Sequence, residues 1–378
     1  MTSRHPNTQH KSVIDADGLQ SLIGVLRDEG YQVIAPRASD DAMVLGQVNG
    51  IEDLPVGVRD EQDGGHYRLV PGAGRALFEY GPGPQGWKRY LYPPEERLWR
   101  ARRHGESFTI EEDSQSTDKY AFLGVRACDL RAMEVQDKVF DREPQGDPRY
   151  VARRKNAFVV AVNCARAGGT CFCVSMASGP RAEDGFDVSL TELIDDDRHV
   201  FLAEAGSKKG VELLERIDRR PASDTEMSRA DAIVSQTAES MGREMIADAE
   251  HVLARNLDSD HWETVADRCL TCGNCTLVCP TCFCTTVEDV TDLSGAIAER
   301  WRKWDSCYSM DFSYIHGGSI RREGAARYRQ WIAHKLSFWH EQFGISGCVG
   351  CGRCITWCPV GIDITEEART LRDGEKDL

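Results

Sequence analysis

Short apolar stretches alternate with helical patterns over the first 220 residues, which is typical of an α/β domain. Residues 18–30 (GLQSLIGVLRDEG) carry apolar side chains at helical spacing and end at Gly30, a residue suited to closing a helix. The segments YQVIAP (31–36) and AMVLGQV (42–48) follow as short strand candidates. The pattern therefore predicts an α/β domain over residues 1–221.

Two further apolar stretches predict buried strands in the second half of this domain. KYAFLGV (119–125) leads into a helix for which Asp129 is a plausible N-cap, and AFVVAVN (157–163) runs directly into Cys164. If these strands are parallel neighbours, Cys128 and Cys164 both emerge at carboxyl ends of the sheet. Open α/β sheets place their ligands at that edge.

Charge and composition exclude several classes of function. The chain has 46 basic and 61 acidic side chains, a formal net charge of −15, whereas a nucleic-acid-binding protein would need a basic face. No run approaches 18 apolar residues, so no membrane span is expected, and the polar first 18 residues predict no secretory signal. Fifteen cysteines without an export signal indicate a reducing, cytoplasmic setting, where metal binding or redox chemistry is commoner than disulfides.

Eight of the cysteines form two copies of one motif. Each copy has the spacing C-x2-C-x2-C-x3-C-P, which is the bacterial ferredoxin pattern for [4Fe–4S] clusters. In two-cluster ferredoxins the fourth cysteine of each run binds the other cluster. We therefore expect one cluster on Cys269, Cys272, Cys275 and Cys358, and a second on Cys348, Cys351, Cys354 and Cys279.

The surroundings of these motifs affect the prediction in two ways. Gly273, Gly350 and Gly352 would let backbone amides approach the sulfurs, where such hydrogen bonds tune the reduction potential. The 68 residues between Cys279 and Cys348 form an unusually long insertion, where a small ferredoxin has only a short connection. A pair of zinc sites is the alternative, although zinc knuckles usually separate their C-x2-C units by a longer spacer.

The complete layout combines both fold classes, α/β and α+β. Residues 222–268 are rich in Ala, Glu and Met and lack proline, which predicts one or two long helices. We interpret 222–260 as a helical connector and 261–378 as a dicluster ferredoxin-like domain with a long insertion. The last dozen residues are expected to form a polar tail.

Seven cysteines lie outside the two motifs. Cys128, Cys164, Cys171 and Cys173 could hold a possible third [4Fe–4S] cluster at the predicted sheet edge. Structural thiols, a flavin-adjacent loop and zinc are the alternatives. Cys282, Cys284 and Cys307 are expected to be buried thiols beside the clusters, because a complete fourth site would require a ligand other than cysteine.

Motifs for substrate chemistry are missing from the sequence. GPGPQG (81–86) matches a dinucleotide fingerprint only formally, since its prolines predict a turn. No phosphate-binding G-x-x-x-x-G-K-[ST] sequence or G-x-S-x-G elbow is present. No catalytic residue is therefore predicted. The basic segment 317–335 is interpreted as a solvated helix face, a protein contact or an internal screen for the clusters.

Several segments together resemble one family. GVRACDLRAMEVQDKVF, DPRYVARRKNAFVVAVNC, GTCFCVSMASGP, GFDVSLTEL, CLTCGNCTLVCPTCFC, RWRKWDSC and HKLSFWHEQFGISGCVGCGRCITWCPVGIDI are similar to the iron–sulfur beta subunit of sulfhydrogenases, which are cytoplasmic, NAD(P)-linked [NiFe]-hydrogenases. The resemblance covers roughly residues 30–368. The electron-transfer subunit of anaerobic sulfite reductases shares the same broad pattern.

The resemblance implies an electron-transfer subunit within a heterotetramer. One partner would bind FAD and NAD(P)H, a small subunit would carry further clusters, and a large subunit would hold the nickel–iron centre. Three alternatives stay open at this point. They are the electron-transfer subunit of an anaerobic sulfite reductase, a flavin-dependent α/β oxidoreductase fed by its own ferredoxin domain, and a zinc-organised interaction protein.

Overall fold

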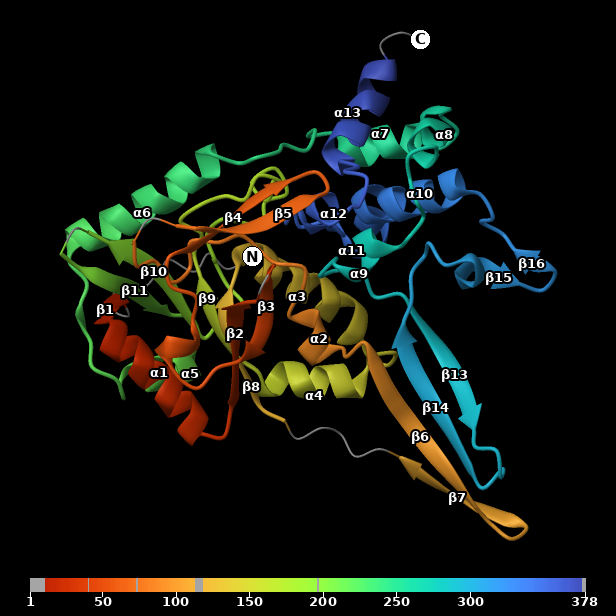
Figure 1. Cartoon of the computed structure of the whole chain (residues 1–378), viewed down its shortest axis with the longest axis horizontal. Helices are drawn as coiled ribbons and strands as arrows, with labels where there is room; N and C mark the ends of the chain where they lie inside the picture. Colours follow the sequence, from red (N-terminus) through yellow and green to blue (C-terminus); the bar gives the residue numbers. More distant parts are fainter. Residues whose placement is uncertain (1–10, 40, 73, 113–117, 196, 376–378) are drawn as a thin grey trace.

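A mixed β-sheet forms the centre of the N-terminal half (Figure 1). The computed structural model describes residues 11–39, 41–72, 74–112, 118–195 and 197–375. Within these residues the largest sheet has eight strands. In spatial order they are β12 (Arg220–Pro221), β1 (Lys11–Asp15), β11 (His199–Ala205), β10 (Val188–Ile194), β9 (Phe158–Val162), β8 (Tyr120–Val125), β2 (Gln32–Ala38) and β3 (Met43–Gln47).

The four adjacent strands β2, β8, β9 and β10 are parallel to one another. An antiparallel neighbour flanks them on each side, β3 beside β2 and β11 beside β10. The predicted strands correspond to β2, β3, β8 and β9. The prediction that β8 and β9 are parallel neighbours is confirmed, with Leu123 opposite Val160. Cys128 and Cys164 therefore follow the carboxyl ends of adjacent strands.

Helices cover both faces of this sheet. Leu22 and Leu26 of α1 (Ala16–Asp28) pack with Val160 of β9 on one face, where α5 (Lys208–Leu214) also lies. On the other face, Met133 of α3 (Ala127–Phe140) packs with Val159 of β9, beside α4 (Pro148–Asn156) and α2 (Lys88–Leu91). Alternate residues of β9 face opposite sides of the sheet, and helices cover both sides. The strand is therefore buried on both faces, as is usual for a parallel strand.

The start of α3 differs from the sequence prediction. The helix begins at Ala127 after Arg126, and Asp129 lies in its first turn rather than at the N-cap. The Asp129 carboxylate is buried and forms an ion pair with Arg353 of the C-terminal region. The Asp129 carboxylate thus binds a cation that is distant in the sequence, rather than the backbone amides that an N-cap side chain would bind.

The segment after the sheet contains three helices, where the sequence predicts one or two. These are α6 (Asp224–Glu239), α7 (Ala249–Arg255) and α8 (His261–Ala266). A capping box between Ser223 and Glu226 starts α6, which packs against β10 and β11. Among the described residues, no helix is long and apolar enough to cross a bilayer.

The C-terminal helices surround a separate apolar core. Trp262 of α8, Tyr328 of α10 (Gly324–Ala333) and Leu371 of α13 (Ile364–Gly374) pack there. A π-helical segment, η4 (His334–Phe338), joins α10 to α11 (Trp339–Phe343). The predicted polar tail is wrong up to residue 374, because α13 buries Ala368 and Leu371, and residues 376–378 lie outside the described residues.

The long insertion pairs with the N-terminal half. Its hairpin, β13 (Thr285–Thr291) and β14 (Ile297–Trp304), joins β6 (Glu95–His104) and β7 (Ser107–Glu112) in a sheet that projects from the body (Figure 1). Beyond β14 lie a 3-10 turn, η3 (Met310–Ser313), and the short strands β15 (Tyr314–Ile315) and β16 (Gly318–Ser319). The base of this hairpin lies just beyond the first cysteine motif, because Cys284 directly precedes β13.

A second hairpin connects the two halves. It is formed by β4 (Val58–Asp63) and β5 (His66–Pro71) and follows a 3-10 turn, η2 (Ile51–Asp53). The amide of Gly65 at its tip donates to the carbonyl of Ile355 at 3.1 Å. Asp63 pairs with Arg243, which also binds Asp363. These contacts hold the C-terminal region against the edge of the sheet.

Candidate iron–sulfur sites

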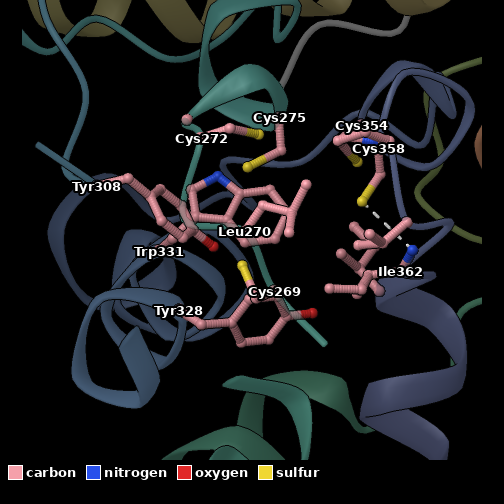
Figure 2. A pocket seen from close by; sticks show the side chains of 14 residues that line it. Cys269, Leu270, Cys272, Cys275, Tyr308, Tyr328, Trp331, Cys354, Cys358 and Ile362 are labelled. Carbon is pink, nitrogen blue, oxygen red and sulfur yellow. Dashed lines mark hydrogen bonds between the residues drawn. The ribbon is translucent and has the colours of Figure 1, made fainter. Parts of the chain in front are cut away.

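The first predicted ligand set lines one cavity. Figure 2 shows sulfurs of this set among the aromatic rings of Tyr308, Tyr328 and Trp331. The crossed cysteine, which belongs to the second motif, faces the same cavity as the three from the first motif. The set that the structure brings together is Cys269, Cys272, Cys275 and Cys358. Cys272 is exposed, so this cavity lies near the surface.

Backbone amides point at several of these sulfurs. The amide of Thr271 lies 3.4 Å from Cys269 Sγ, and that of Ile362 lies 3.4 Å from Cys358 Sγ. The i to i+2 contact of Thr271 recurs for Thr281 on Cys279 and for Gly350 on Cys348, both at 3.5 Å. The expected approach to sulfur is confirmed for Gly350. Gly273 and Gly352, which like Gly350 have positive φ, are the N-cap residues of two short helices, α9 (Asn274–Leu277) and α12 (Arg353–Thr356).

The second ligand set lies deeper in the molecule. Cys279, Cys348 and Cys351 are buried, and Cys354 is partly buried. Burial raises the pKa of Cys354, and the neighbouring thiols of Cys348, Cys351 and Cys279 raise it further. The four predicted ligands therefore lie close enough together for their charges to interact. Cys354 also reaches the wall of the first cavity, so the two sets adjoin.

The candidate third site lines a cavity at the sheet edge. Cys128 comes from the first turn of α3, Cys164 follows β9, and Cys171 and Cys173 lie on the loop beyond it. All four line one cavity, together with Cys351 of the second set. Burial raises the pKa of Cys171 to about 12 and also raises the pKa of Cys128. The sheet edge and the second ligand set thus share a wall.

Glycine makes this close approach sterically feasible. The amide of Phe172 donates to the carbonyl of Gly350 at 2.8 Å. A Cβ on Gly350 would lie 2.6 Å from the Phe172 carbonyl, and one on Gly352 would lie 2.4 Å from that of Thr170. Both glycines also have positive φ, so larger residues there would be strained as well as crowded.

The three remaining cysteines line a further cavity. Cys282, Cys284 and Cys307 are only partly buried, whereas the sequence predicts buried thiols. A hydrogen bond from Cys307 lowers the pKa of Cys284 to about 7. A hydrogen bond from Cys282, aided by Lys335, lowers the pKa of Cys279 well below its usual value.

Buried cations accompany these thiols, and most of them carry no signal in the sequence. Arg126 donates to the carbonyls of Phe78 and Tyr80, and its charge lies near Cys164. Lys88 donates to the carbonyls of Cys279 and Cys282. Lys335 lies 3.1 Å from Cys279 Sγ, so this part of the basic segment is internal. Burial alone would lower the pKa of Lys335, but Cys279 and Cys282 raise it well above its ordinary value.

These donor sets fit multi-iron clusters. Within the described ranges, no three or more His, Cys, Asp or Glu side chains converge closely enough to hold a single metal ion. Each thiolate of a cubane binds a different iron, so its ligands surround a space rather than meeting at a point. The first and third sets surround cavities in this way. When bound, such a cluster would carry one electron per redox step.

The buried Arg353–Asp129 pair provides a test of how the two halves are held together. The two guanidinium–carboxylate distances are 2.8 and 3.2 Å. Arg353→Met would leave a buried carboxylate unpaired, so we expect the free energy of unfolding to fall by about 3–5 kcal/mol. Anaerobic denaturant unfolding measures this change.

A matched control is Arg372→Met, which removes a partly exposed cation beside Asp373. Its effect should stay below about 1 kcal/mol. Equal unfolding midpoints for the wild type and Arg353→Met would contradict the structural role of the buried pair.

Comparisons with known proteins agree with this geometry. Residues 268–362 match the family model of the 4Fe-4S dicluster domain. The chain is 33% identical over 298 residues to sulfhydrogenase 2 subunit beta of Pyrococcus furiosus, an alignment that covers 76% of this chain and 83% of that protein. The chain therefore belongs to the family of sulfhydrogenase beta subunits and is an iron–sulfur electron-transfer subunit with a C-terminal 4Fe-4S dicluster domain.

Proposed function

We propose that this chain relays electrons through [4Fe–4S] clusters between a flavin- and NAD(P)H-binding partner and a [NiFe]-hydrogenase module. The observation that carries the proposal is the continuity of the three cysteine sets. Cys354 of the second set reaches the wall of the first cavity, and Cys351 reaches the wall of the third. Electrons entering at one end would therefore meet adjoining sites along one path.

The proposed ligands follow the crossed ferredoxin pattern. Cluster 1 takes Cys269, Cys272, Cys275 and Cys358, which line one cavity. Cluster 2 takes Cys279, Cys348, Cys351 and Cys354, and a third cluster takes Cys128, Cys164, Cys171 and Cys173. The amides on Cys269, Cys279, Cys348 and Cys358 would stabilise the more negative, reduced state.

Partner subunits would supply the chemistry at both ends of this path. The exposed Cys272 and the neighbouring exposed Leu270 and Leu277 favour electron exchange across a protein interface near cluster 1. FAD and NAD(P) would then reside on one partner, and the small and large hydrogenase subunits would form the other, in a cytoplasmic heterotetramer. The name of the Pyrococcus relative, which is a sulfhydrogenase beta subunit, supports this assembly.

The domain plan is part of the same proposal. The α/β domain (1–221) would hold the third cluster, the connector (222–260) would link it to the rest, and residues 261–378 would hold the other two. A relay in an anaerobic sulfite reductase is the second candidate, because the same cysteine sets would serve it equally well.

Selective cysteine substitutions test the ligand assignment. The three sites together should hold about twelve irons and as many sulfides. Cys358→Ser should remove or alter the same EPR signal as Cys269→Ser, because both residues face one cavity. Cys279→Ser should instead resemble Cys348→Ser. Uncrossed ligation would reverse these pairings, with Cys358→Ser matching Cys348→Ser.

A hydrogen-driven assay of the purified complex tests the relay itself. Cys171→Ser should abolish or strongly reduce hydrogen-dependent NAD(P) reduction, because it breaks the path at the sheet edge. Hydrogen oxidation with an artificial dye should persist at the nickel–iron subunit. Full NAD(P) reduction by the variant would contradict a third cluster in the path, and copurification of a sirohaem protein would favour the sulfite reductase.

A further inference from the structure

A spacious cavity lies outside the three sites of the proposed relay. Its volume is about 380 Å³, and its wall includes Cys282, Cys284, Cys307 and His334. Since a water molecule occupies roughly 30 Å³ of liquid, this space holds far more than one ion or one solvent molecule.

The projecting hairpin brings two of the cysteines together. Cys284 immediately precedes β13, and Cys307 follows β14 by three residues. The pairing of Thr285 with Trp304 closes the base of the hairpin, and the amide of Asp305 donates to the carbonyl of Cys284 at 2.8 Å. Two cysteines that are 23 positions apart therefore reach the same cavity wall.

A π-helical segment forms another part of the cavity wall. Residues His334 and Lys335 begin the π-helical segment between α10 and α11, and both line the cavity. Short π-helical segments inside α-helices frequently occur at functional sites, because the extra residue redirects neighbouring side chains. Lys335 and Arg321 also give this wall positive charge, which favours an anionic occupant.

The local sequence repeats that of the third site. Thr170–Cys171–Phe172–Cys173 and Thr281–Cys282–Phe283–Cys284 have the same four residues. Both threonines are buried. The amide of Phe172 donates to the carbonyl of Gly350 within the second motif, and the Thr281 hydroxyl donates at 2.7 Å to the carbonyl of Gly347, the residue just before that motif. In each case the two cysteines face a cavity that further potential ligands complete.

We propose that this cavity holds a fourth [4Fe–4S] cluster, with Cys282, Cys284 and Cys307 as thiolate ligands and His334 as the nitrogen ligand. Imidazole replaces cysteine on iron in other iron–sulfur proteins, so the missing fourth thiol is no obstacle. This site is additional to the proposed relay and adjoins its second ligand set at Lys335, which lines the cavity and lies 3.1 Å from Cys279 Sγ.

Two simpler explanations account for less of the geometry. A single zinc ion requires its ligands to converge, and among the described residues no such group is present. Inert structural thiols would explain why Cys282 and Cys307 pack against the C-terminal apolar core, but not the open space and the two cations beside all three cysteines.

Iron and sulfide analysis of the anaerobically purified full chain, with pulsed EPR of the reduced protein, tests the proposal. The wild type should hold about sixteen irons and Cys307→Ser about twelve. His334→Cys should keep the full count but lose the strong nitrogen coupling of a directly bound imidazole. Phe312→Leu, which alters an apolar residue of the same wall, should keep both the count and the coupling.

Three results would overturn the fourth site. One is an equal iron content in the wild type and Cys307→Ser. Another is stoichiometric zinc that is lost with Cys307. The third is an unchanged spectrum in His334→Cys, and this variant decides the matter alone if Cys307→Ser does not fold. The four-iron difference is independent of the iron in the other sites, so failure here is distinguishable from failure of the relay.

Discussion

Burying negatively charged sulfur is costly, and this cost governs how the whole molecule is arranged. Most of these thiols lie where burial alone would keep them protonated, as the raised pKa values of Cys128 and Cys171 indicate. An anionic cluster can occupy such a place only if positive charge and N–H donors surround it. Arg126, Arg353 and Lys335 provide buried positive charge, and backbone amides provide the donors.

The same cost explains why the two halves of the chain interlock. The candidate third site is completed only where the sheet edge meets the second motif, with Cys351 in its wall. Arg353 pairs with Asp129 across that boundary, and Gly350 and Gly352 let the backbones approach closely. Electron transfer along adjoining sites favours this compact arrangement, because each shared wall shortens the path between neighbouring ligand sets.

Local signals allowed much of this to be predicted from the sequence. The spacing around Cys269 and Cys348 determines a loop geometry by itself, and the apolar stretches before Cys128 and Cys164 identified two adjacent strands. The charge partners could not be found in this way. Asp129 had the signature of an N-cap, and only the fold reveals that Arg353, 224 positions away, binds it. The pairing of β14 with β6 is equally non-local, so the role of the insertion in bringing Cys284 to Cys307 was hidden as well.

Anomalous diffraction at the iron edge, from anaerobic crystals of the loaded full chain, would show directly whether three adjoining clusters form the relay. We expect separate iron peaks within the cavity of Cys269 and Cys358, beside Cys279 and Cys348, and at the sheet edge between Cys128 and Cys171. Each peak should lie within reach of the buried cations or amides described for it. Iron confined to the first two positions, with the thiols of Cys128, Cys164, Cys171 and Cys173 packed without metal, would contradict a relay that reaches the sheet edge.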